Sequence, residues 1–315
     1  MKPLKIRAFF LLLSAALILL SACSAKPSPG EAVRIGALKG ATTIGMVKYI
    51  EDAASVVDFS VVTADEIVPM IVKGDVDVAA VPVNLAATLY KNTGGGIKVL
   101  AINTLGLTYI VETGDTVKTV SDLRGKTVYA TGKGTVPEFS LRRILKKNGL
   151  DPDTDLTLEF KSEPAEVVAH LKLNGGIAML PQPFVTTAED AVPNLRAALD
   201  LTEEWGDDTG SLVIGVLVAR VDFLAREDDV KAVLDGCRES AAWVNENPSD
   251  AAPLVEKAGI VPAAIAERAI PKCHLTFIEG DEMRELLAPF LGVLFEESPA
   301  SVGGSLPDDG FYYAG

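Results

Sequence analysis

Short apolar runs typical of β-strands alternate with helical runs twice along the chain, and this alternation limits the fold more than any other feature. The first group places strands at 33–38, 57–63, 76–82 and 97–103, with helices at 42–53, 64–74 and 84–92. The second group places strands at 126–131, 155–161, 176–181 and 195–201, with helices at 137–149, 163–175 and 184–191. Such alternation indicates mainly parallel sheets covered by helices, so we expect an α/β protein with two similar halves.

Two pairs of loops follow equivalent strands in the two halves. Lys39-Gly40 comes after the first strand of one half, and Lys133-Gly134 comes after the first strand of the other. Asn84 and Gln182 follow later strands that end on proline in both halves. Because ligands of open α/β sheets bind at the carboxyl ends of the strands, we expect these loops to form a binding site.

The residue types in these loops suit a small polar ligand. Glycine lets the backbone approach a ligand, threonine adds a hydroxyl group, and a helix N-terminus favours negative charge. The threonines could instead serve only as helix caps, and Phe184 could stack on a planar ligand or fill the core between the halves. Side-chain amides offer both a donor and an acceptor. The candidate ligand-binding residues are Lys39, Gly40, Thr42, Thr43, Pro82, Asn84, Lys133, Gly134, Thr135, Gln182 and Phe184.

Two long β-type runs, at 105–114 and 211–224, connect the two halves. If both runs cross between lobes, they form a hinge, and the rest of the chain returns to the first lobe as helices at 227–247, 249–258, 262–269 and 281–296. We therefore expect lobe 1 to comprise 31–109 and 216–315, and lobe 2 to comprise 110–215. The apolar face of the helix at 227–247 includes Cys237, and we expect Trp243 near that face to lie in the core.

The N-terminus has the pattern of an export signal. Lys2, Lys5 and Arg7 precede an apolar stretch that is short for a membrane span, and the stretch closes on "LLSACS". This ending resembles a lipoprotein signal peptide, which implies a signal peptide at 1–22, lipid on Cys23 and a tether at 23–30. An ordinary signal peptide or a short anchor with an incidental cysteine is the alternative.

Composition and motifs argue against several other classes of function. The formal net charge of −14 disfavours nucleic acid as a partner. The "GKT" at 125–127 lacks the earlier glycine of a nucleotide-binding P-loop and precedes a strand, and neither His170 nor His274 stands beside a plausible nucleophile. Two isolated histidines also disfavour a metal site. We therefore expect no catalysis, no cofactor and no metal, whereas a Cys237–Cys273 disulfide stays open.

Several segments together resemble one family of transport proteins. They are the N-terminal signal, "LKGATTIGMVKYI", "DEIVPMIVKGDVDVAAVPVNLAATLY", "VSDLRGKTVYATGKGTVPEF" and "AMLPQPFV". In order and spacing they look like a bacterial ABC-transporter solute-binding lipoprotein of the sulfonate, taurine, nitrate and thiamine-precursor group. The resemblance covers essentially the whole mature chain. It implies the type II periplasmic-binding-protein fold, in which each lobe is a mainly parallel sheet flanked by helices and two crossings form the hinge.

The resemblance also implies partners and a location. We expect a monomer that binds a small solute between its lobes, passes it to an ABC permease and ATPase, and contacts the membrane through lipidated Cys23. It would lie outside the cytoplasm, on the cell membrane or on the periplasmic side of a two-membrane envelope. The loop residues favour a small organic anion, sulfonate- or carboxylate-like. A thiamine-precursor pyrimidine is the alternative ligand, and a sensory binding lipoprotein without a transporter is the alternative role.

Overall fold

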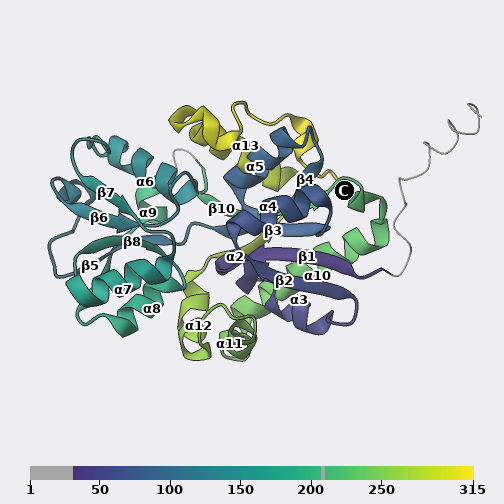
Figure 1. Ribbon diagram of the computed structural model, residues 1–315, viewed down its shortest axis with the longest axis horizontal. Coiled ribbons are helices and arrows are strands. Elements are labelled where there is room, and N and C mark those ends of the chain that lie inside the picture. Colours follow the sequence, from purple (N-terminus) through teal and green to yellow (C-terminus); the bar gives the residue numbers. More distant parts are fainter. Residues whose placement is uncertain (1–30, 207–209) are drawn as a thin grey trace, which may run out of the picture. The chain divides into compact units, whose positions relative to one another are not determined.

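Two separate sheets, each flanked by helices, organise the computed structural model, which describes residues 31–206 and 210–315 (Figure 1). The predicted α/β class with two sheets is confirmed. The predicted signal peptide, the tether and Cys23 lie outside the described residues. Within the described ranges, no helix combines the length and apolar composition needed to cross a membrane.

Sheet 1 has six strands in the order β11–β4–β10–β3–β1–β2. Their bounds are β1 Val33–Leu38, β2 Val57–Val62, β3 Val78–Pro82, β4 Ile97–Leu105, β10 Val213–Arg220 and β11 Leu275–Ile278. β1 runs parallel to both β2 and β3, whereas β10 is antiparallel to β3 and β4. The late strand β10 therefore fills the middle of a sheet whose other central strands come from the first third of the chain.

Sheet 2 has five strands in the order β7–β6–β8–β5–β9. Their bounds are β5 Thr108–Thr113, β6 Thr127–Ala130, β7 Thr157–Phe160, β8 Ile177–Pro181 and β9 Leu195–Asp200. β6 is parallel to β7 and β8, and β5 is antiparallel to β8 and β9. All five strands come from one uninterrupted stretch of sequence.

Twelve helices of the described residues cover these sheets. They are α2 Ala41–Ile44, α3 Val47–Asp52, α4 Ala64–Lys73, α5 Val83–Asn92, α6 Val136–Lys147, α7 Pro164–Asn174, α8 Phe184–Ala191, α9 Leu201–Trp205, α10 Glu227–Glu246, α11 Pro248–Lys257, α12 Ala263–Ala269 and α13 Gly280–Glu297. Short 3-10 turns lie at Val120–Leu123, Phe223–Ala225, Ile270–Lys272, Pro299–Val302 and Asp309–Phe311.

One predicted helix is divided in the structure. The run at 42–53 was expected to be continuous, but it forms α2 and α3 with a break at Gly45 and Met46. The Met46 amide donates to the carbonyl oxygen of Thr43, three residues back, at 2.9 Å, and this tighter turn ends α2.

The strand bounds near the two predicted crossings differ from the expected lobe boundaries, and the division into lobes stays a prediction. β4 ends at Leu105, Gly106 and Leu107 make the first connection, and β5 begins at Thr108, so the expected boundary at 109/110 falls inside β5. The boundary at 215/216 falls inside β10, which joins sheet 1 from Val213. The apolar pattern alone could not separate the end of one strand from the start of the next.

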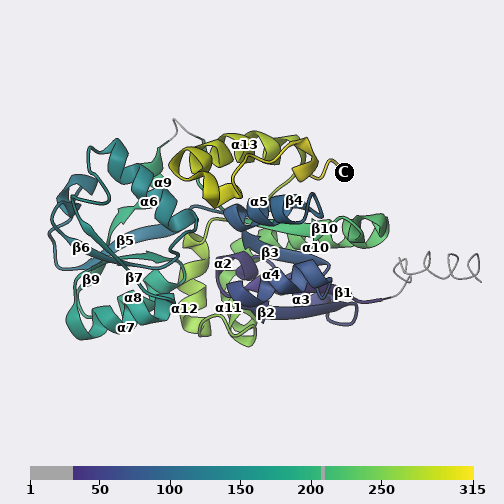
Figure 2. The same cartoon turned by 45° about the horizontal axis from the view of Figure 1, so that its top comes forward.

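The apolar core differs between the two flanks of the protein. One cluster contains residues of both sheets and continues through α13, α6 and α9, where the Trp205 and Phe290 rings lie 5.6 Å apart. On the flank formed by α12 and α8, the clusters belong to sheet 1 or to sheet 2 separately. Figure 2 shows α13 and α6 on one side of the protein and α12 and α8 on the other.

Candidate functional site

The predicted loops lie at the carboxyl ends of neighbouring parallel strands. β1 and β3 pair in parallel, so the loops that begin at Lys39 and at Val83 leave the same edge of sheet 1. β6 and β8 also pair in parallel, so the loops at 131–135 and 182–184 leave one edge of sheet 2. The first crossing joins the same two edges, because Leu105 pairs with Val213 and Thr108 pairs with Pro181.

A hydrogen bond joins these two edges directly. The Asn84 side-chain amide, after β3, donates from Nδ2 to the Gly134 carbonyl oxygen, after β6, at 3.4 Å. The structure therefore brings together two of the predicted residues from different sheets. We refer to the loops 39–43, 82–84, 131–135 and 181–184, with Thr108 and Thr202, as the interlobe edge.

The two amide side chains of the interlobe edge each have one polar atom without a partner. Asn84 is 7% exposed and Gln182 is 2% exposed, yet Asn84 Oδ1 and Gln182 Nε2 make no hydrogen bond among the described residues. Gln182 Oε1 accepts from the Thr186 amide at 3.3 Å and the Thr186 hydroxyl at 2.9 Å, which fixes the orientation of its amide group. The edge thus offers one acceptor, on Asn84, and one donor, on Gln182.

Two threonines that the sequence analysis missed have the same property. Thr108, the first residue of β5, and Thr202, in α9, carry buried hydroxyl groups without a partner in the described part of the chain. Tyr109 pairs with Asp200, so α9 begins at the same edge of sheet 2 as β5. Both threonines sit in runs where threonine is an ordinary β-former or helix cap, and only their position after strand ends could have indicated them.

Three predicted threonines use their polar groups within the protein. Thr43 is fully buried and its hydroxyl donates to the Leu38 carbonyl at 2.6 Å, so it supports the loop from inside. The Thr135 hydroxyl donates to the Gly132 carbonyl at 2.6 Å. Thr42 is half-buried, and its carbonyl accepts from Asn103 Nδ2 at 3.0 Å.

The expected anion cradle is weaker than the sequence suggests. The Gly134 amide donates to Glu138 Oε2 at 2.6 Å, so a carboxylate of the protein already occupies that donor. Glu138 is 7% exposed and pairs with Arg142 at 2.9 Å. In sheet 1, the helix after Gly40 has only four residues. So few peptide dipoles add up to only a small partial charge at the helix N-terminus, which would attract an anion weakly.

The other predicted residues lie around this edge without direct partners across it. Lys39 and Lys133 are exposed, and Lys133 Nζ lies 6.0 Å from the centre of the Phe160 ring. Pro82 ends β3 opposite Gly215 of β10. Phe184 is half-buried and packs against the apolar cluster of sheet 2 alone, so it does not fill a core shared by the two halves, and its role in stacking on a ligand stays a prediction.

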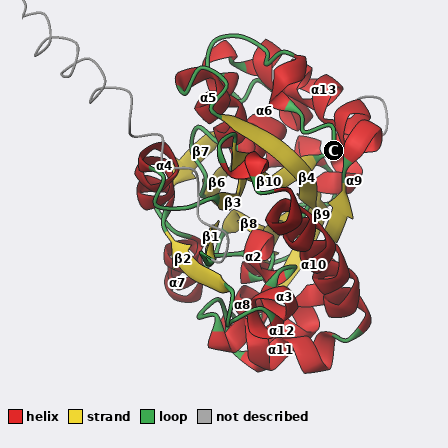
Figure 3. Ribbon diagram, turned by 90° about the vertical axis from the view of Figure 1, so that its right-hand side faces the viewer, coloured by secondary structure: helices red, strands yellow, loops and turns green. Residues whose placement is uncertain are grey.

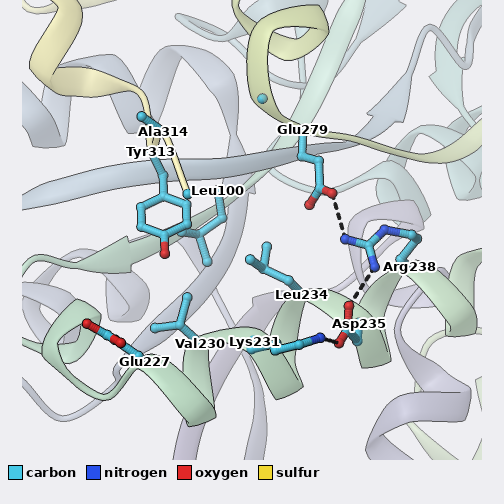
Figure 4. A pocket seen from close by; sticks show the side chains of 12 residues that line it. Leu100, Glu227, Val230, Lys231, Leu234, Asp235, Arg238, Glu279, Tyr313 and Ala314 are labelled. Carbon is cyan, nitrogen blue, oxygen red and sulfur yellow. Dashed lines mark hydrogen bonds and ion pairs between the residues drawn. The ribbon is translucent and has the colours of Figure 1, made fainter.

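Four cavities described in the structure have no residue of these loops in their lining. One of about 330 Å³ lies between α10 and the last residues of the chain, where Arg238 pairs with both Asp235 and Glu279 (Figure 4). Another, of about 470 Å³, lies beside Tyr129 and His170 at the amino ends of β6 and β8. A third, of about 570 Å³, lies between α3 and α10, and a small one of about 10 Å³ adjoins Cys237.

The cysteines and histidines form no metal centre in the described part of the chain. Cys237 and Cys273 are both buried free thiols in different apolar clusters. Burial raises the pKa of each thiol to about 12, so both stay protonated at neutral pH.

Comparison with known proteins decides the family. A model of the NMT1/THI5-like family matches residues 57–251, which is more than half of the chain. The chain belongs to the NMT1/THI5-like family. No curated protein matches this NMT1/THI5-like chain.

Solved structures similar to this NMT1/THI5-like protein include an ABC transporter and periplasmic binding proteins. An ABC transporter structure from Parabacteroides distasonis shares 24% identity over 90% of this chain and 98% of its own, with a TM-score of 0.77. The periplasmic aliphatic sulphonate binding protein SsuA from Escherichia coli shares 20% identity over 89% and 93%, with a TM-score of 0.70. The periplasmic nitrate-binding protein NrtA from Synechocystis PCC 6803 shares 16% identity over 81% and 75%, with a TM-score of 0.59. The expected two-lobed binding-protein fold is therefore confirmed.

Proposed function

We propose that this protein is an extracytoplasmic receptor that binds a small organic solute at the interlobe edge and delivers it to an ABC permease and ATPase. The observation that carries the proposal is the Asn84–Gly134 hydrogen bond between the two sheets, beside the unpartnered atoms Asn84 Oδ1 and Gln182 Nε2. A buried polar group without a partner costs about 1–3 kcal/mol, so a ligand that completes both groups gains affinity. The amides and hydroxyls here support binding rather than catalysis.

The ligand class follows from the free atoms. Asn84 Oδ1 requires a donor on the ligand, and Gln182 Nε2 requires an acceptor. A small organic anion meets both needs if its sulfonate or carboxylate accepts from Gln182 and an amine or hydroxyl donates to Asn84. Lys39 and Lys133, exposed beside the two loops, favour the negative charge.

A neutral aminopyrimidine of the thiamine-precursor type is the second candidate. Its ring nitrogens can accept a hydrogen bond from Gln182 Nε2, and its amino group can donate one to Asn84 Oδ1. The specific observation in its favour is that Glu138 already accepts from the Gly134 amide, so this donor of the expected anion cradle is not available to an anion.

Calorimetry can test the proposal and separate the two ligands. Taurine, an alkanesulfonate, nitrate and hydroxymethylpyrimidine would each be titrated into the wild-type protein and into the variants Gln182→Ala, Asn84→Ala, Lys133→Ala and Glu138→Gln. An anion should bind more tightly to Glu138→Gln and more weakly to Lys133→Ala, whereas the pyrimidine should respond chiefly to Gln182→Ala. Tight binding that Gln182→Ala and Asn84→Ala both leave unchanged would reject the interlobe edge as the site.

We also propose that Cys23 carries the lipid that holds the receptor on the membrane. The support is the cysteine at the end of the apolar N-terminal stretch. Replacing Cys23 by Ser should release the protein or leave an uncleaved precursor, with ligand binding by the remaining domain intact. Normal processing and membrane retention of Cys23→Ser would contradict this anchor.

A further inference from the structure

The cavity between α3 and α10 contains a buried hydroxyl group that nothing in the fold uses. Ser240 of α10 lines this cavity, is 1% exposed, and its Oγ has no hydrogen-bond partner among the described residues. A helical serine usually donates to the carbonyl four residues back, but Ser240 does not. The volume of about 570 Å³ lies within the range of small-molecule sites.

The walls of this cavity are apolar and aromatic. Tyr49 of α3 packs directly on α10 at Gly236, where a Cβ atom would collide with its ring. Trp243 is half-buried rather than fully in the core, as the sequence had suggested, and it lines the same space. Val56, at the edge, is 59% exposed. These surfaces suit a compact apolar or aromatic body.

The charges around the cavity leave one carboxylate free. Lys48 Nζ donates to both carboxylate oxygens of Asp52, at 2.5 and 2.6 Å, so these two charges cancel. Glu239 lines the cavity one helical turn before Trp243, is exposed, and has no ion pair or hydrogen bond among the described residues. Lys48 Nζ also lies 5.3 Å from the centre of the Trp243 ring, so the cation beside that ring comes from the protein, and a ligand ammonium group is left with Glu239.

We propose that this cavity is a second ligand site, separate from the interlobe edge, for an organic ammonium compound with a compact aromatic body. The ammonium group pairs with Glu239, the body contacts Tyr49 and Trp243, and a polar atom of the ligand completes Ser240. A neutral ligand would leave Glu239 unpaired, and an anion would be repelled by it. The site does not depend on the proposed transport function.

The test uses 2-phenylethylamine as the probe and its neutral isostere 2-phenylethanol as the comparison. Calorimetry on the full chain should show saturable binding of the amine and several-fold weaker binding of the alcohol. Glu239→Gln should weaken binding of the amine about two- to fivefold, the range of an exposed ion pair. Glu246→Gln, an exposed acid of the same helix without a partner in the described structure, should have no effect.

Two further variants make the result specific. Ser240→Ala should weaken binding without loss of stability, because it removes a buried hydroxyl that has no partner. Gln182→Ala, at the interlobe edge, should leave binding of the amine unchanged. The proposal is overturned if the amine does not saturate at millimolar concentration, if Glu239→Gln binds like wild type, or if Gln182→Ala abolishes binding.

Discussion

At the scale of single residues, two threonines of the interlobe edge make opposite use of their hydroxyl groups. Thr108 is buried without a partner, whereas Thr43 is buried and donates to the Leu38 carbonyl. We expect Thr108→Val to keep or raise the free energy of unfolding, because it removes an unpaired polar group, and to weaken solute binding. Thr43→Val should lower that free energy by about 1–2 kcal/mol. Urea denaturation of both variants is the measurement, and equal losses in both would contradict the assignment.

Glu112 gives a residue-scale prediction about pH. Burial alone would raise the pKa of its carboxyl, but hydrogen bonds from the Val117 amide, from Thr116 and from Arg196 outweigh it and hold the pKa below the ordinary value of 4.5. Because the folded pKa is lowered, this stabilisation is complete above pH 4.5 and disappears as the pH falls through the folded value. Glu112→Gln should cost roughly 1–3 kcal/mol at pH 7 and progressively less in acid. Denaturation at pH 7 and pH 3 measures the difference, and an equal loss at both would refute it.

At the level of single residues, the sequence could predict which side chains lie at a sheet edge, but not which residues they contact there. Asn84 and Gln182 stand directly after apolar strands, so their position at a sheet edge could be predicted. That Asn84 meets Gly134, or that Glu138 occupies the Gly134 amide, depends on how two distant loops approach each other. No local pattern contains that information, and the role of all these residues in ligand binding stays a prediction.

At the scale of elements, the crossing from β4 to β5 depends on Gly106, which has no side chain. A Cβ atom on Gly106 would collide with the Thr202 hydroxyl and its neighbouring carbons at the start of α9. We expect Gly106→Ala to lower the free energy of unfolding by about 1–3 kcal/mol, as over-packing does. Gly292→Ala is the matched control: Gly292 lies inside α13 with open space around it, so the change should stabilise by up to about 1 kcal/mol. Thermal unfolding of the two variants is the measurement, and similar changes of the unfolding temperature in both would contradict the role of Gly106.

Most helices and strands could be predicted from the sequence, whereas the residues at which they begin and end could be predicted less well. The alternation of apolar runs indicated the strands and the helices between them, because each βα unit must bury one face of its helix. The break at Gly45, the short helix α9 and the strand β11 were missed, since all three depend on contacts with other parts of the fold. Lobe 1 and lobe 2 as hinged bodies remain a prediction from the two crossings.

At the scale of the whole molecule, the two flanks predict where the lobes separate. Around α13, a shared apolar cluster joins the sheets, and Lys146 pairs with Glu297 at 2.5 Å. Around α12, the link consists of ion pairs, with Arg268 to Asp190 at 2.5 Å and Lys272 to Glu189 at 3.6 Å. Exposed ion pairs contribute about 0–1 kcal/mol each, far less than a shared apolar core, so we expect the hinge to open on the α12 side.

Small-angle scattering can measure this opening. Arg268→Gln should increase the radius of gyration of the ligand-free protein, and high salt should do the same to the wild type. Lys146→Gln, on the apolar flank, should leave it unchanged. A true ligand should reduce the radius of gyration by favouring the closed arrangement. Equal responses of the two variants would contradict a hinge on the α13 side.

The late position of β10 also has a consequence for the order in which the chain becomes structured. All strands of sheet 2 lie between Thr108 and Asp200, so that sheet can assemble from one continuous segment. In sheet 1, whose strands are yellow in Figure 3, β10 lies between β3 and β4. Sheet 1 has a gap between β3 and β4 until β10 is added, and those two strands cannot pair directly without excluding it. A chain that stops before Val213 leaves both strand edges unpaired, and such edges promote aggregation. A chain of this design therefore needs protection from premature collapse until β10 is complete at Arg220.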